Sequence, residues 1–214
     1  MARPENGYWR DGVHVISNTE ALSGTRVRRW SGKKATWERR SRIGSAVHLA
    51  AAILDCNNKT WDDAPREWIE PYDAVSPEVR GFCLAWERCK REEQIIVKLV
   101  EHSFFAKVDL SEFATTVDRV GLRRSEPAII ELKTPKAAEP YWGIQLAGQH
   151  LAVVANLGPP TVRPFRYQRW VAQLFATGKY KLIPYTDEQD FVIFRQSLNI
   201  AIWNRNAYGD ERGK

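Results

Sequence analysis

The sequence predicts an α/β protein with a mixed central β-sheet flanked by helices, and three observations favour this class. Two amphipathic helical segments come first, at about residues 37–54 and 76–93. Three β-branched, strand-like runs follow between residues 95 and 134. A further helix, a hairpin and a last helix then occupy residues 141–205. Strands that alternate with helix-length segments are typical of a sheet covered by helices.

The two N-terminal helices are predicted from apolar residues spaced three and four positions apart. This spacing joins Ile43, Val47, Ala50 and Leu54 in the first helix. Ser76 followed by Pro77 is a helix-start signal for the second. Its buried side is expected to hold Phe82, Leu84, Ala85, Trp86 and Cys89. The stretch between the helices contains Pro65 and Pro71 and is predicted to be a loop, and residues 7–36 are predicted to be irregular with one or two strands.

The strands are predicted from β-branched composition and alternation. The expected strands are Ile95–Val100, Phe113–Leu122 and Ala128–Thr134, the last ended by Pro135. His102–Val108 either continues the first strand or pairs with it. A helix over Tyr141–Asn156 is followed by a hairpin that turns at Thr177–Gly178. Either Asp187 or Asp190 is expected to cap the last helix.

Length and composition indicate one globular domain over residues 1–214, with a basic, partly irregular segment at 1–36 and a core at 37–205. No run approaches the roughly 20 apolar residues of a membrane span. The start, Met1–Gly7, lacks the apolar core of a signal peptide, so a cytoplasmic protein is expected. Three cysteines without a Cys-x-x-Cys pair argue against a disulfide framework and against a four-cysteine zinc or iron–sulfur site.

The net charge of +6 is concentrated near the N-terminus. Residues 1–50 hold ten Lys/Arg and four Asp/Glu, which accounts for the whole excess. Cations interleaved with tryptophans suit a phosphate backbone and its bases. The candidate DNA-binding residues are Arg28, Arg29, Trp30, Lys33, Lys34, Arg39 and Arg42. An ordinary solvated basic face is the alternative, and charge alone leaves both open.

Asp118, Glu131 and Lys133 are the residues most suggestive of chemistry. Glu131 and Lys133 share a strand face because they are two residues apart, and a hairpin would bring Asp118 beside them. Converging carboxylates repel each other unless a cation lies between them, and oxygen ligands suit Mg²⁺ or Mn²⁺. A nearby ammonium can orient water and offset charge on a phosphate. The alternative is a solvated strand edge, but the apolar run Ala128–Ile130 before Glu131 favours a buried strand.

Four motifs in order resemble the PD-(D/E)XK nuclease superfamily, and more narrowly its RecB-type branch, which includes phage exonucleases. They are Arg42-x-Gly44-x-x-x-His48, Thr116–Val120, Ile129–Thr134 and Gln145-x-x-x-Gln149. The order and spacing agree over residues 42–150. Val117 stands where the family name has Pro, and Gln149 stands where Tyr is frequent, which leaves the role of Gln149 open.

The resemblance implies a restriction-endonuclease-like core and a Mg²⁺-dependent deoxyribonuclease, with Mn²⁺ as a substitute and one or two ions per site. It implies that Asp118, Glu131, the backbone carbonyl of Leu132 and His48 bind metal, that Lys133 orients water, and that Gln145 positions the site. Glu101 is either a further carboxylate outside the direct metal ligands or solvent-exposed. Taken alone, a histidine on an apolar helix face, such as His48, is more often a core residue than a ligand.

The expected substrate is DNA, and the expected activity is that of an exonuclease of phage or recombination-repair type. A homo-oligomer or a recombination partner protein is left open. The alternatives are a non-catalytic DNA-binding protein on the same fold and a structure-specific endonuclease or resolvase.

Overall fold

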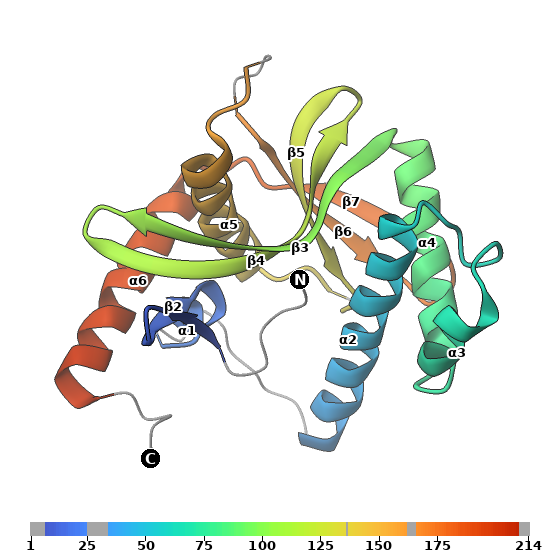
Figure 1. Cartoon of the computed structure of the whole chain (residues 1–214), viewed down its shortest axis with the longest axis horizontal. Helices are drawn as coiled ribbons and strands as arrows, with labels where there is room; N and C mark the ends of the chain where they lie inside the picture. The colour runs from blue at the N-terminus through green and yellow to red at the C-terminus, as the bar shows by residue number, and fades with distance from the viewer. Residues whose placement is uncertain (1–6, 25–33, 136, 162–165, 210–214) are drawn as a thin grey trace.

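The computed structural model describes residues 7–24, 34–135, 137–161 and 166–209 (Figure 1). Thirteen elements lie within these ranges. In chain order they are β1 (Tyr8–Arg10), β2 (Val13–Ser17), α1 (Asn18–Gly24), α2 (Lys34–Cys56), α3 (Arg66–Asp73), α4 (Glu78–Glu92), β3 (Ile95–Val108), β4 (Ser111–Arg123), β5 (Glu126–Lys133), α5 (Tyr141–Leu157), β6 (Gln168–Leu174), β7 (Tyr180–Pro184) and α6 (Gln189–Tyr208).

The strands form one mixed sheet in the order β1-β2-β4-β5-β6-β7, with β3 paired to β4 off this path. The β2–β4 and β5–β6 pairs are parallel, and the other pairs are antiparallel. Helix α5 connects the parallel strands β5 and β6, as a crossover between parallel strands requires. The predicted fold class, a mixed central sheet flanked by helices, is confirmed.

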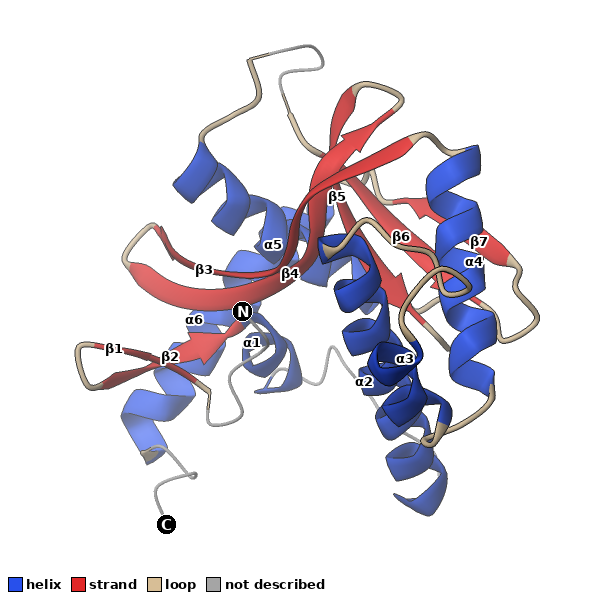
Figure 2. Cartoon of the chain, turned by 45° about the vertical axis from the view of Figure 1, so that its right-hand side comes forward, coloured by secondary structure: helices blue, strands red, loops and turns tan. Residues whose placement is uncertain are grey.

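Helices cover both faces of the sheet, as Figure 2 shows. Helices α2 and α4 pack on one face, and α1, α5 and α6 pack on the other. Strand β5 is buried between the two layers. Its residues Ala128, Ile130 and Leu132 belong to the core on the α2 side, whereas Ile129 belongs to the core on the α5 side. A strand buried on both faces reads as a continuous apolar run, which is how Ala128–Ile130 reads.

Strand β4 has one partner, β3, along one edge and two partners, β2 and β5, along the other. Strand β3 pairs with it along nearly its whole length, from Ser111 to Arg123. On the other edge, β2 pairs with Phe113 and Ala114, and β5 pairs with residues from Arg119 onward. The registers therefore leave a gap on this edge between Ala114 and Arg119, where β2 has ended and β5 has separated from β4. Asp118 lies at the end of this gap.

Two short helices depart from the sequence prediction. Helix α1 lies within residues 7–36, where only one or two strands were expected, beside the hairpin of β1 and β2. Its start is a capping box, because the Glu20 amide donates to Ser17 Oγ (3.1 Å) and the Ser17 amide donates to Glu20 Oε2 (3.0 Å). Helix α3 lies in the predicted proline loop and contains Pro71. It is only eight residues long, so this proline disrupts little of the helix.

The other elements follow the sequence prediction closely. Residues 102–108 continue β3 rather than pair with it. Of the two acids proposed to cap the last helix, neither is the N-cap residue, which is Glu188. Asp187 lies just before it, and its Oδ1 accepts a hydrogen bond from the Gln189 amide (2.9 Å). Asp190 instead pairs with Arg169. Within the described ranges, every helix is too short or too polar to cross a lipid bilayer.

Candidate metal centre

Glu101 and Asp118 face each other across the β3–β4 ladder. The residues on either side of them are paired, Val100 with Arg119 and His102 with Val117, so Glu101 and Asp118 occupy the position between. The backbone of Glu101 has a φ of +44°, which is uncommon for a residue with a side chain. Backbone strain of this kind is often found at functional sites.

Glu131 continues the same row onto β5. The β4–β5 ladder ends at the pair Arg119–Ile130, so Glu131 follows at the position that Asp118 would oppose. The two strands separate here, and Asp118 Oδ2 accepts a hydrogen bond from the backbone amide of Leu132 (2.7 Å). Three carboxylates on three adjacent strands are thus brought into one row. Buried carboxylates are costly without nearby cations.

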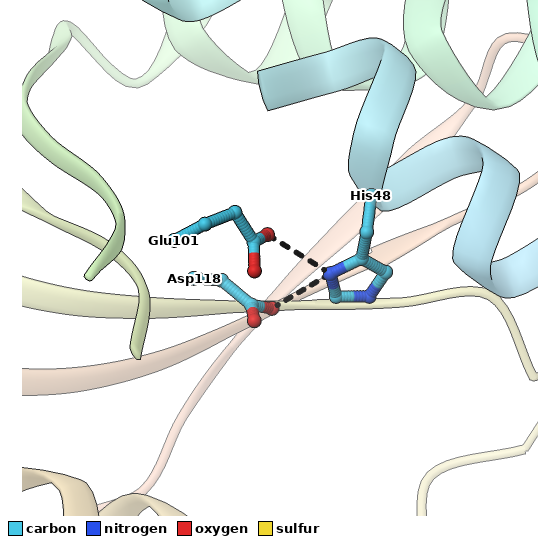
Figure 3. Close-up of side chains that lie close together, drawn as sticks. All are labelled: His48, Glu101 and Asp118. Atoms are coloured by element: carbon cyan, nitrogen blue, oxygen red, sulfur yellow. Dashed lines mark hydrogen bonds and ion pairs between the residues drawn. The ribbon is translucent and has the colours of Figure 1, made fainter. Parts of the chain in front are cut away.

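His48 reaches this row from helix α2 (Figure 3). Its Nδ1 lies 3.3 Å from Glu101 Oε1 and 3.5 Å from Asp118 Oδ2. Burial opposes protonation of the imidazole, but Asp118 and Glu101 outweigh this effect and raise the pKa of His48 to about 10. The His48 side chain is 27% exposed and faces two acids, so the core interpretation of His48 does not describe its surroundings.

The donor atoms of these three residues fit a small divalent cation. One ligand atom from each of His48, Glu101 and Asp118 lies within 4.8 Å of the other two. Two donors that bind one ion at about 2.1 Å, at right to tetrahedral angles, are about 3.0–3.4 Å apart. The observed separations from His48 Nδ1 are close to this range. Two carboxylates and one imidazole offer the oxygen and nitrogen donors that divalent cations bind in proteins.

Glu131 is held by three side-chain donors. Its Oε1 accepts hydrogen bonds from Lys133 Nζ (2.7 Å) and Gln145 Nε2 (2.6 Å), and its Oε2 accepts one from Gln149 Nε2 (2.7 Å). Lys133 Nζ also donates to Gln145 Oε1 (3.1 Å). Burial opposes the charge on Lys133, but Glu131 and other neighbours outweigh it and raise the pKa of the ammonium. Because a carboxylate oxygen can accept two hydrogen bonds, Oε2 keeps one acceptor position free of these contacts.

The arrangement of α5 explains why the two glutamines reach Glu131. Gln145 and Gln149 are four residues apart and therefore lie on the same side of the helix. Gln149 Nε2 also donates to the backbone carbonyl of Thr116 (3.2 Å), so it links α5 to both β4 and β5. Gln149, whose role the sequence left open, thus binds the acid at the strand end.

The structure brings together most of the residues that the sequence singled out for chemistry. His48, Glu101 and Asp118 form one group, and Glu131, Lys133 and Gln145 form a second group beside it. Leu132 joins the two through its backbone amide, which faces Asp118. Glu101 is not solvent-exposed, since its side chain is 15% exposed, and its role at a metal stays a prediction. The metal-ligand roles of Glu131 and of the Leu132 carbonyl stay predictions.

Of the candidate DNA-binding residues, Arg39 and Arg42 are the two whose side chains the structure describes. Arg28, Arg29, Trp30 and Lys33 lie outside the described residues, and only the backbone of Lys34 lies within them. Arg39 and Arg42 are exposed on α2. Arg39 forms an ion pair with Glu78 (3.4 Å), which is a surface contact between α2 and the start of α4.

Two buried residues beside the site were missed by sequence reasoning. Arg119 on β4 and Asp55 on α2 form an ion pair of 2.6 Å, and each side chain is 1% exposed. Asp55 is seven residues after His48, and this spacing places both on the same side of α2. That spacing was the available signal, together with the position of Arg119 in an apolar strand.

Comparisons with known proteins support the fold. No protein-family model and no curated protein matches the chain. The chain is similar to a crystal structure from Eubacterium rectale named "Putative exonuclease", with a TM-score of 0.53 and 10% sequence identity over 90% of this chain and 79% of that one. The crystal structure of SSO0001 matches with a TM-score of 0.38 and 11% identity, over 83% of this chain and 90% of that one. The first similarity shows that this chain shares the α/β fold of that protein.

Proposed function

We propose that this protein is a metal-dependent nuclease that hydrolyses phosphodiester bonds in DNA, built on the PD-(D/E)XK plan. The observation that carries the proposal is the group of His48, Glu101 and Asp118, linked through the Leu132 amide to the strand that holds Glu131 and Lys133. The order of the sequence motifs supports it, and so does the name of the structural neighbour.

His48, Glu101 and Asp118 would hold a divalent cation. The sequence motifs add Glu131 as a further ligand, through the Oε2 atom that accepts one hydrogen bond from Gln149. When bound, Mg²⁺ or Mn²⁺ would lower the pKa of water and offset charge on the phosphate. A bound cation would also offset the charge of the acids, and it would share this role with charged side chains that already face them. Without one, Arg119, Lys133 and the protonated His48 are the groups that compensate the carboxylates.

Lys133 would orient the attacking water and stabilise negative charge that develops on the phosphate. Glu131 Oε1 and Gln145 Oε1 hold its ammonium at 2.7 and 3.1 Å, so two acceptors fix the position of Nζ. The side chain is 16% exposed, which leaves it open to solvent. Gln145 would therefore position Lys133 as well as Glu131.

The neighbour's name and the RecB-type motifs favour an exonuclease over an endonuclease. The basic segment at residues 26–42 would guide DNA toward the site through its phosphates. A non-catalytic DNA-binding protein has no need for a lysine held by both Glu131 and Gln145, so the geometry favours an enzyme over that alternative.

The test is digestion of end-labelled linear DNA and of closed circular DNA with Mg²⁺, Mn²⁺ or EDTA. An exonuclease degrades the linear DNA in either metal, spares the closed circle and is inactive in EDTA. Cleavage of the circle would indicate an endonuclease, and full activity in EDTA would rule out the metal-dependent mechanism. Asp118→Asn is the matched inactive control, because it removes a charge from the site and keeps the size of the side chain.

A further inference from the structure

We propose that Arg119 is a positioning residue that sets Glu101 for metal binding, and that Asp55 in turn fixes Arg119. The proposal rests on the proposed metal site. Arg119 lies next to Asp118 in β4, but its side chain packs on the α2 side of the sheet, against Trp86 of α4 at 6.0 Å from the ring. It therefore approaches the acid row from the protein interior.

The guanidinium of Arg119 connects three groups. Its NH1 donates to Glu101 Oε1 (3.2 Å) and to the backbone carbonyl of Asp118 (2.7 Å). The Glu101 oxygen that it contacts is the same one that faces His48 Nδ1. Arg119 thus ties the Glu101 carboxylate to the main chain at Asp118, and it does so at the atom where Glu101 would meet the cation.

Asp55 holds the other end of this side chain. Its Oδ2 accepts hydrogen bonds from Arg119 Nε (2.6 Å) and Trp86 Nε1 (2.9 Å), and Lys90 Nζ contacts its Oδ1. A buried carboxylate with three donors is well ordered and costly to disturb. Helix α2 therefore supports the metal site twice, directly through His48 and indirectly through Asp55 and Arg119.

This geometry makes a specific prediction about charge. A cation next to Glu101 repels a metal ion, so a purely electrostatic role for Arg119 predicts that removing its charge tightens metal binding. A positioning role predicts weaker binding even when the charge is kept. Lysine keeps the charge but lacks the fork of donors, so it cannot make the contacts of both Nε and NH1.

The experiment is a calorimetric titration of MnCl₂ into the metal-free protein and its variants. Arg119→Lys is expected to weaken Mn²⁺ binding by about tenfold or more, the usual effect of losing a residue that supports a metal ligand. Arg169→Lys is the matched control. Arg169 is also a buried arginine and pairs with Asp190 (3.1 Å), but it is on β6 and contacts none of His48, Glu101 and Asp118 in the described structure. Its Mn²⁺ affinity should stay within about twofold of wild type.

A double-variant test shows whether Arg119 acts through Glu101. In the Glu101→Gln background, Arg119→Lys should weaken Mn²⁺ binding no further, because the carboxylate that it positions is already lost. Thermal melts in EDTA confirm that each variant is folded. If Arg119→Lys does not fold, Asp55→Asn replaces it, and weaker Mn²⁺ binding is again expected.

Wild-type or tighter Mn²⁺ binding by the folded variant would overturn the proposal, and so would an equal loss in the Glu101→Gln background. If the wild-type protein itself binds no Mn²⁺, the proposed metal site fails and this inference fails with it. If it binds Mn²⁺ and the variants do not differ, the inference alone fails.

Discussion

Asp118 accepts, through its side chain, a hydrogen bond from the backbone amide of Leu132, with 2.7 Å between Oδ2 and N. If the β4–β5 ladder continued, a backbone carbonyl of β4 would accept the hydrogen bond of this amide. The contact therefore satisfies a buried donor at the point where the two strands separate, and it holds Asp118 beside Glu131. The Asp118 carboxylate therefore has two roles, to accept the Leu132 amide in the fold and to bind metal in the proposed mechanism. Mutation can separate these roles.

Asp118→Asn should keep the fold and lose metal binding, whereas Asp118→Ala should lose both metal binding and stability. Asparagine retains an oxygen that can accept the Leu132 amide, but alanine leaves this buried donor unpaired. The cost of such an unpaired group is about 1–3 kcal/mol. Urea unfolding in EDTA measures the difference between the two variants. Equal stabilities would show that the Leu132 contact contributes nothing to the fold.

His48→Gln should weaken Mn²⁺ binding, and it should lower the melting temperature of the metal-free protein only through the lost ion pairs with Glu101 and Asp118. The side chain is partly exposed and contacts the two acids, so its loss leaves no large cavity in the core. Leu54→Ala is the contrasting variant, since Leu54 is 2% exposed on the same helix. It should lower stability by about 2–5 kcal/mol without changing Mn²⁺ affinity. A calorimetric titration beside a thermal melt separates a ligand from a core residue. If His48→Gln lost much stability and kept its metal affinity, His48 would be a core residue and not a metal ligand.

The sequence was enough to predict the two-faced burial of β5 and the position of Glu131 and Lys133 at its end. Both follow from local patterns, an apolar run and a spacing of two. Glu101 could not be placed in the same way, because its position depends on the β3–β4 register and on a positive φ at the residue itself. Arg119 read as an ordinary strand residue, since its partner Asp55 is 64 positions away in the chain. Contacts of this kind depend on how α2 packs on the sheet, which local spacing does not determine.

His150 should make the fold sensitive to acid. Burial, together with the nearby charges of Arg169 and Arg166, lowers the pKa of His150 to about 4, whereas the unfolded chain has the ordinary value of 6.5. Between these two pH values the unfolded chain binds the proton and the folded chain does not. Stability from this residue is therefore fully present above pH 6.5 and falls as the pH drops toward 4, by at most about 3 kcal/mol.

His150→Gln, which has no charge to gain, tests this expectation. The ring lies between the aromatic rings of Tyr167 and Phe191, at 6.3 and 5.2 Å between centroids. The variant should lose less stability than wild type when the pH is lowered from 7 to 4, whatever its stability at pH 7. Urea unfolding at both pH values gives the change in unfolding free energy for each protein. Comparing wild type with the variant removes the contribution of the other titrating groups, which the two proteins share. Parallel losses in the two proteins would mean that His150 takes up its proton without cost.

Substitutions of Lys133 and Glu131 should affect metal binding and cleavage differently, although the two residues share a strand face and form an ion pair of 2.7 Å. Lys133→Met should keep Mn²⁺ and DNA binding and lower single-turnover cleavage by about 10² or more, because it removes the group that orients water and offsets developing charge. Glu131→Gln should lower cleavage and weaken Mn²⁺ binding together. Lys181→Met, at an exposed position of β7, is the control and should cleave at the wild-type rate.

The assay is cleavage with enzyme in excess over DNA, paired with a Mn²⁺ titration of each variant. A loss of cleavage in Lys133→Met could also arise if Glu131 moved when its ammonium partner was removed. The titration distinguishes this case, since a displaced Glu131 would weaken Mn²⁺ binding as Glu131→Gln does. Gln145 and Gln149 still hold both oxygens of Glu131 in the variant, so we expect its position to be kept. Wild-type cleavage by Lys133→Met would end the role proposed for this lysine.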